Sequence, residues 1–423
     1  MIKALQDPIV DDGIPFTAFF NGRLLSGEDL ARDQQGHREA RKRLGQAEGD
    51  GVAYGLEVFE TPGESTRSSP VVSVRPGVAV SRAGVALSLP RQVDLRLVRA
   101  SAGGADAVDA TAFGVCAPQQ PGVYVVGEGV YVLLMSCARA GQGRAPVSGL
   151  GNAASSCNVR AMVEGVQFRL VQPPITPSLL ADHMRVRQRV AAIALGVLDR
   201  QKPYVNPMAG AGSSLRLIDA LRATGAVTDT DVPLAVLHWT ASGGITFVDL
   251  WSVRRRLTPR GADQRWAWLF GERLQAETEA VFLQFQEQID DIAASGDDLT
   301  TIAAQDRFEY LPPLGFLPLK IGTRAGFDPQ TFFGEGMLPR DVAVTDGDLL
   351  RELVRESFSH DPIALAPPER VQLYFVHENV QAVGAGQSVA PVIVFARRTL
   401  RYRGVARYGI ARWDLSRFGP RVI

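Results

Sequence analysis

Cysteine, lysine and histidine are all scarce in this chain of 423 residues. The three cysteines, Cys116, Cys137 and Cys157, are odd in number and form no Cys-x-x-Cys pair. This pattern argues against a disulfide framework and against a cysteine-ligated metal, and it favours buried thiols in neighbouring strands. The five histidines are scattered, which leaves few bases for nucleophilic catalysis.

The best catalytic candidate is the segment around His360. Asp361 follows this histidine, and Ser357 and Ser359 lie just before it. No Gly-x-Ser-x-Gly elbow accompanies the segment, and Pro362 is typical of a helix exit. We therefore predict that the chain is not an enzyme.

Other candidate sites also have simpler interpretations. The paired acids at 290–291 and 297–298 lack the spacing of a calcium loop, and we interpret them as solvated acids at helix ends. The glycine run at 209–212 lacks the lysine of a phosphate-binding loop and is interpreted as a linker. We predict no catalytic residue, no cofactor and no metal.

The chain also lacks an excess of charge and a long apolar run. Its 45 Lys and Arg residues balance 45 Asp and Glu residues, so no nucleic acid partner is expected. The apolar stretches are far shorter than the ~18 residues of a membrane span, and the N-terminal residues have no signal-peptide core. We predict no membrane span and a cytoplasmic location on synthesis. Arginine supplies nearly all cations, which weakly favours protein interfaces.

The segment 26–48 predicts a polar helix. Ser26 is a good N-cap, Asp29 stands where a capping-box partner is expected, and Gly45 is a plausible stop. Because the helix is so polar, we expect it to lie across a sheet or another subunit. The residues that approach an apolar stripe are Leu30, His37, Ala40 and Leu44.

The rest of the chain predicts an α+β, multidomain protein with a β-rich N-terminal region, a long amphipathic helix in the middle and a mixed C-terminal region. Strands are expected throughout 52–172, including 122–138 and 159–171, with a loop at 140–156. The later elements expected are a segment at 177–198 that begins as a helix and ends as a strand, a helix at 215–221, a hairpin at 234–253, a helix at 262–294, a boundary at 312–322, a helix at 346–357, and two strands joined by a turn at 371–396. The predicted domains are 1–173, 174–310 and 311–423.

A resemblance accompanies these patterns. Residues 20–30 read Phe-Asn-Gly-Arg-x-Leu-x-x-Glu-Asp-Leu, and residues 51–58 read Gly-Val-x-x-Gly-Leu-Glu-Val. A hairpin at 74–89 reads V-x-PG-x-A-x-x-x-x-G-x-x-L-x-L, and further likeness occurs at 231–239, 247–256 and 394–398. The chain thereby resembles a family of structural, baseplate-associated proteins of phage-tail-like contractile injection systems.

The resemblance implies a structural part of such a particle, in or around the baseplate, that acts by protein-protein assembly. A terminal cap, or an adaptor for a fibre or anchor, is the alternative position. The implied partners are baseplate, sheath or tube components and copies of the chain itself, and the family context favours sixfold symmetry. Two other classes stay open: a cargo enzyme, and a carbohydrate- or surface-binding module that would expose Trp239, Trp251 and Trp413.

Two segments are the predicted interfaces. In the first, Phe20 and Leu24 are expected to anchor the chain against an apolar surface, and Asn21-Gly22 to turn it. The second is the C-terminal tail, where arginines alternate with aromatics; docking onto an acidic protein is favoured over single-stranded nucleic acid. The predicted interface residues are Phe19, Phe20, Asn21, Leu24, Leu25, Glu28, Asp29, Arg398, Arg401, Tyr402, Arg403, Arg407, Tyr408 and Trp413.

Overall fold

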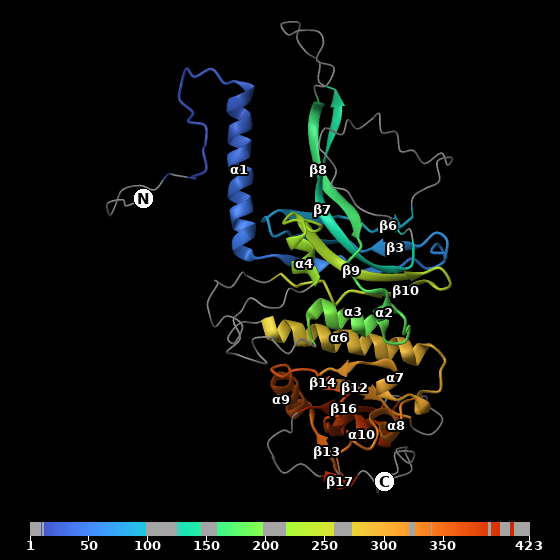
Figure 1. The fold of residues 1–423 in the computed structure, drawn as a ribbon. Coiled ribbons are helices and arrows are strands. Elements are labelled where there is room, and N and C mark those ends of the chain that lie inside the picture. Colours follow the sequence, from blue (N-terminus) through green and yellow to red (C-terminus); the bar gives the residue numbers. More distant parts are fainter. Residues whose placement is uncertain are drawn as a thin grey trace.

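The computed structural model describes residues 10, 12–98, 125, 127–144, 159–197, 217–257, 273–320, 326–339, 341–387, 391–397 and 407–409 (Figure 1). Helices alternate with several small sheets, which confirms the predicted α+β multidomain class. From top to bottom, Figure 1 shows a projecting helix and hairpin, a β-rich layer, a layer of helices, and a second sheet with its own helices.

Helix α1 (Gly27–Glu48) begins where the sequence predicts. The Ser26 side chain accepts a hydrogen bond from the Asp29 backbone, and the Asp29 carboxylate accepts one from the Ser26 backbone. The predicted stop at Gly45 is wrong, because the helix continues for three more residues and Gly49 caps it with φ of 106°. Gly45 serves a different purpose: a β-carbon there would lie 2.3 Å from the Gly84 carbonyl oxygen. Glycine is needed for close packing of the helix foot and not for a turn.

Two three-stranded antiparallel sheets follow α1. Their orders are β1-β4-β5 and β2-β3-β6. The strands confirm the β-structure expected in this part of the chain, and turns at 75–76 and 81–85 separate β3 from β4 and β4 from β5. The bounds are β1 (Gly51–Gly55), β2 (Val58–Glu60), β3 (Val71–Val74), β4 (Gly77–Val80), β5 (Ala86–Leu89) and β6 (Val93–Arg96).

A four-stranded sheet in the order β10-β9-β7-β8 forms the centre of this half. Its strands are β7 (Gly129–Arg144), β8 (Val159–Val171), β9 (Asp231–Thr240) and β10 (Gly244–Asp249). Along β7, Tyr131, Leu133 and Met135 enter a core shared with the two small sheets. The alternate residues Val130, Val132 and Leu134 enter a second core on the opposite face. The predicted 234–253 hairpin is confirmed as β9–β10, and this sheet joins strands from both sides of the predicted boundary at 173/174.

The distal halves of β7 and β8 extend beyond β9. Residues 137–144 of β7 pair only with 159–166 of β8 among the described strands, whereas residues 132–136 pair with both β8 and β9. This two-stranded ribbon stands beside α1 in Figure 1. Arg139 lies 3.0 Å from Glu164 across the ribbon, and the Arg38 guanidinium of α1 lies 4.0 Å from the same carboxylate. The predicted loop at 140–156 is therefore wrong for residues 140–144, which belong to β7, and residues 145–156 lie outside the described residues.

The second core is covered by short helices. These are α2 (Pro177–Leu180), α3 (Val186–Leu195) and α4 (Leu217–Ala223), the last of which was predicted. The strand expected at the end of 177–198 is wrong, because Val186, Val190 and Ala194 recur at helical spacing and pack into this core. A short apolar run does not distinguish a buried helix from a strand.

Helix α6 (Arg273–Ala294) separates the two halves (Figure 1). Its predicted end at Ser295-Gly296 is confirmed, with φ of 85° at Gly296, while 262–272 lie outside the described residues. Phe285, Ile289 and Ile292 of α6 belong to the C-terminal core. The helix therefore packs against the C-terminal core as well as bordering the N-terminal half.

The C-terminal half contains a five-stranded mixed sheet in the order β12-β16-β15-β13-β17. Strands β13 and β15 are parallel and are connected through α9, whose Asp346 cap confirms the predicted helix. The elements are η1 (Leu299–Thr301), α7 (Ala304–Arg307), β11 (Tyr310–Leu311), β12 (Leu314–Pro318), α8 (Pro329–Phe333), β13 (Asp341–Thr345), α9 (Gly347–Ser357), β14 (Ile363–Ala364), β15 (Gln372–Val376), α10 (His377–Gly384), β16 (Val392–Ala396) and β17 (Arg407–Gly409).

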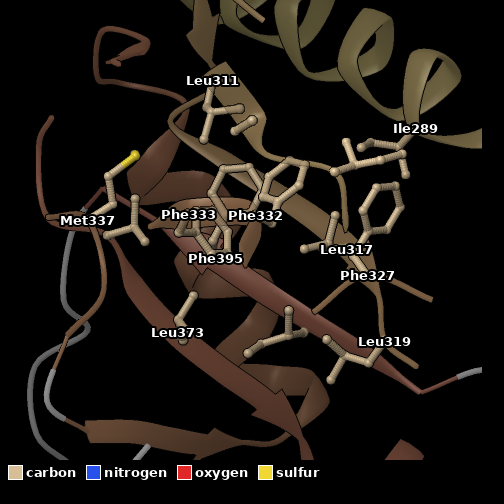
Figure 2. Close-up of a cluster of buried hydrophobic side chains, with 14 of the residues drawn as sticks. Ile289, Leu311, Leu317, Leu319, Phe327, Phe332, Phe333, Met337, Leu373 and Phe395 are labelled. Atoms are coloured by element: carbon tan, nitrogen blue, oxygen red, sulfur yellow. The ribbon is translucent and has the colours of Figure 1, made fainter. Parts of the chain in front are cut away.

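Figure 2 shows the core of this half, in which α6 packs over the sheet. Aromatic rings meet edge to face, as for Phe285 with Phe395 at 5.4 Å between centroids, and for Phe332 with Phe333 at 5.0 Å. This core extends across both the predicted division at 310/311 and the proline-rich boundary at 312–322. The turn expected between the last two strands is wrong, because α10 connects β15 to β16.

Candidate assembly surface

Residues 12–25 form an arm that runs back along α1 (Figure 1). Arg43 near the end of the helix donates a hydrogen bond to the Asp12 carbonyl at 2.8 Å, and Thr17 donates one to the Asp29 carbonyl at 2.7 Å. Between these points, the rings of Phe16 and His37 meet edge to face, with their centroids 6.0 Å apart. The arm is therefore held at several points along the helix.

The capping box of α1 also holds the end of the arm. The Asp29 carboxylate accepts hydrogen bonds from the Ser26 backbone at 3.1 Å, the Ser26 hydroxyl at 2.9 Å and the Arg23 guanidinium at 2.5 Å. The same guanidinium donates to the Ala18 carbonyl at 2.6 Å. The Ser26 backbone and hydroxyl bonds, with the positive charge of Arg23, lower the pKa of Asp29. The Asp29 carboxylate thus caps the helix and also fixes the end of the arm through Arg23. We call this set of contacts the Asp29 clip.

These polar contacts leave the apolar side chains of the arm outside. Twelve large apolar side chains are exposed in the described part of the chain, and eight of them belong to residues 10–44. Phe20 is 67% exposed and Leu24 is 93% exposed. Exposed apolar groups that gather on one segment mark interaction surfaces, whereas scattered ones do not. The eight residues are Val10, Phe16, Phe19, Phe20, Leu24, Leu25, Leu30 and Leu44.

The predicted N-terminal interface residues behave in two ways. Phe19, Phe20, Leu24 and Leu25 are exposed, so no apolar surface within the described chain anchors Phe20 and Leu24. Asn21 and Gly22 form the expected turn, with φ of 87° at Gly22. Glu28 is exposed, but Asp29 is engaged in the clip and is withdrawn from solvent.

The stripe predicted on α1 is not buried within the chain. Leu30 and Leu44 are 51% and 64% exposed, and Gly36 is the residue of the helix that is buried. The cause is the position of α1, which stands away from the cores and meets the body at its foot, where Gly45 lies against Gly84, and at Arg38, which lies 4.0 Å from Glu164.

The predicted C-terminal interface lies mostly outside the described residues. This applies to Arg398, Arg401, Tyr402, Arg403 and Trp413. Arg407 and Tyr408 belong to β17, whose backbone pairs with Ala343 and Val342 of β13. No local pattern predicted this edge strand, through which part of the tail joins the sheet.

In the segment around His360, the two serines lie in different surroundings. Ser359 donates its hydroxyl hydrogen bond to the Glu356 carbonyl, and the Ser357 hydroxyl is buried without a hydrogen-bond partner in this part of the chain. No cluster of three or more metal-ligating side chains occurs among the described residues. The four acids predicted to be solvated are exposed, and three of them also have structural partners: Asp298 caps η1, Asp297 pairs with Arg307 at 2.8 Å, and Asp291 pairs with Arg187 at 2.7 Å.

The tryptophans on β-structure do not form a binding platform. Trp239 and Trp251 are half-buried and pack against the core that the four-stranded sheet shares with the two small sheets. Their indole nitrogens donate to the Arg67 carbonyl and to Glu287, both at 3.2 Å. Trp413 lies outside the described residues, so the feature expected of a carbohydrate-binding module is not assembled in the described chain.

A small hollow near the end of α1 is lined by Asp50, Gly51, Arg222 and Asp231, among others. Asp231 is fully engaged: it accepts hydrogen bonds from Arg169, from Ser136, and from the Thr228 backbone at 2.6 Å. Burial raises the pKa of Asp231, but the bonds from Arg169, Ser136 and Thr228 lower it by more, and the net shift is downward. This carboxylate stays ionised and serves the fold.

A buried polar network joins the two halves at α6. Gln284 of α6 donates to the Asp249 carboxylate at the end of β10 at 2.8 Å, and Ser252 donates to the same carboxylate at 2.5 Å. Arg187 of α3 reaches Glu287 at 2.5 Å and Asp291 at 2.7 Å on α6. The sequence offered no signal for this network, because its members lie far apart along the chain and only packing brings them together.

No helix in the described part of the chain is long and apolar enough to cross a membrane. Comparison with known proteins adds no relative: no protein-family model matches the chain, and no curated protein matches it.

Proposed function

We propose that this chain is a structural subunit of a phage-tail-like contractile injection particle, in or around its baseplate, and that it acts by protein-protein assembly. The supporting observation is the gathering of exposed large apolar side chains on the arm and α1. Fully burying one such side chain is worth about 1.5–3 kcal/mol, so several of them supply a strong assembly surface.

The attachment of the arm also supports this proposal. An arm held by the Asp29 clip, by Thr17 and by Arg43 presents Phe20 and Leu24 in a fixed arrangement. A pre-ordered surface loses less conformational entropy on binding than a free tail does. The segment that carries the exposed side chains is also the one that carries the densest family resemblance.

The test is complementation of a strain that lacks this chain, with the particles examined by negative-stain electron microscopy. We expect missing density at one end of the particles without the chain, and its return with the wild-type chain. A Phe20→Ser/Leu24→Ser double variant should not restore that density. Met184→Ser is the matched control, because Met184 is also exposed but lies away from the arm.

Density at the baseplate end supports the baseplate position, whereas density at the opposite end indicates a cap. Normal particles in the absence of the chain, or full rescue by the double variant, would contradict the proposal.

A further inference from the structure

Five residues of α1 form a face next to the arm: Phe16 of the arm contacts the His37 ring, whose side chain stays 64% exposed. Successive members are separated by three, four, four and three positions, so they lie on one side of the helix. Leu30 and Leu44 at the two ends are exposed. The five residues are Leu30, Asp33, His37, Arg41 and Leu44.

This face has the same spacing in both directions, with His37 at its centre. If the direction of the helix is reversed about His37, Leu30 takes the position of Leu44, and both are apolar. Asp33 then takes the position of Arg41, which has the opposite charge. Such a face is self-complementary in an antiparallel pair, because each leucine meets a leucine and each carboxylate meets a guanidinium. A parallel pair would instead place Asp33 against Asp33 and Arg41 against Arg41.

The charges along the whole of α1 follow the same arrangement. Its first half carries three acids and one arginine, and its second half carries four cations and two acids. This distribution also complements the helix dipole. Within the described chain, no ion pair joins Asp33 or Arg41 to a residue outside α1: Asp33 is half-buried and lies 3.7 Å from His37, and Arg41 is exposed.

We infer that a second copy of this chain packs its α1 antiparallel against this face, with the twofold axis at His37. The inference rests on the proposed function, since it takes α1 as an assembly surface. Because α1 has 22 residues, and an α-helix rises about 1.5 Å per residue, the pair overlaps over roughly 33 Å. The arm of the second copy then lies at the foot of the first α1, next to β1, where Tyr54 is exposed.

Cysteine cross-linking tests the register. In a background in which Cys116, Cys137 and Cys157 are serine, full-length chains that carry Leu30→Cys are mixed with chains that carry Leu44→Cys and are oxidised mildly. We expect a disulfide-linked dimer from the mixture. Neither variant alone should cross-link, because equivalent leucines would lie about 21 Å apart at 1.5 Å per residue. Cross-linking of Leu30→Cys alone would overturn the antiparallel register.

Charge reversal tests the contacts by sedimentation velocity of the full chain. We expect Asp33→Arg or Arg41→Asp alone to raise the dimer dissociation constant about tenfold, since each introduces two like-charge contacts per dimer. The double variant should restore the wild-type constant. A chain that stays monomeric, or single variants that dimerise as the wild type does, would overturn the inference. If dimerisation fails while the Phe20→Ser/Leu24→Ser variant still blocks incorporation into particles, the proposed function stands and the partner of α1 is another protein.

Discussion

The ring of Phe16 rests on the backbone of Gly36, and a β-carbon at Gly36 would lie 2.9 Å from two of its ring carbons. The same β-carbon would lie 3.0 Å from the Pro15 carbonyl oxygen. Glycine is the poorest helix former apart from proline, by about 1 kcal/mol relative to alanine. Gly36 therefore weakens the helix locally and gives the arm a place to lie.

Gly36→Ala should release the arm without unfolding the protein. The substitution favours the helix by up to about 1 kcal/mol but displaces Phe16. We expect faster cleavage between residues 12 and 25 in limited proteolysis, with little change in melting temperature. Gly27→Ala is the control, because a β-carbon at Gly27 meets nothing within 4 Å. Equal cleavage of both variants would show that the Gly36 contact does not hold the arm.

Phe20→Ala and Phe332→Ala should differ sharply in stability. Phe20 is exposed, and surface substitutions usually change the free energy of unfolding by less than about 0.5 kcal/mol. Phe332 is buried in the aromatic core, where such a truncation costs about 3–5 kcal/mol. Urea denaturation measures both. A large loss for Phe20→Ala would mean that the arm is part of a folded core and not an open surface.

The Asp231–Arg169 pair should make the free energy of unfolding depend on pH in the acidic range. Arg169→Met leaves a buried carboxylate without its cation, and breaking such a pair costs about 3–5 kcal/mol. The pKa of Asp231 is lower in the folded state than in the unfolded state, so its contribution is full above the unfolded value near 4 and is lost as the pH falls through the folded value.

Denaturant midpoints measured from pH 7 down to pH 3 test this linkage. The stability difference between the wild type and Asp231→Asn should shrink as the pH falls below about 4. A difference that stays constant over this range would show that Asp231 does not titrate with folding.

Gln284→Leu should weaken the junction between the two halves. It removes a hydrogen bond to the buried Asp249 carboxylate, and a buried group that loses its partner costs about 1–3 kcal/mol. The free energy of unfolding measures the loss. Gln275→Leu lies on the same helix and is exposed, so it should have almost no effect. Equal effects of the two changes would assign the loss to helix propensity and not to the junction.

Local signals in the sequence determined the start of α1, the β9–β10 hairpin and the end of α6. Each depends on residues close together in the chain: the Ser26–Asp29 capping box, a glycine-containing turn, and Gly296. The same signals predicted that α1 is too polar to fill a core, and the structure places it outside the cores.

Only the tertiary structure decided what depends on distant residues. Gly45 was predicted to end the helix, but the structure shows that its role is close contact with Gly84. The apolar run after Val190 is helical because one side of it packs into a core. The Gln284–Asp249 bond and the arm along α1 need contacts between segments that no local pattern encodes. Local patterns also did not predict the order of the five strands in the C-terminal sheet, because strand pairing depends on contacts between segments that lie far apart in the chain.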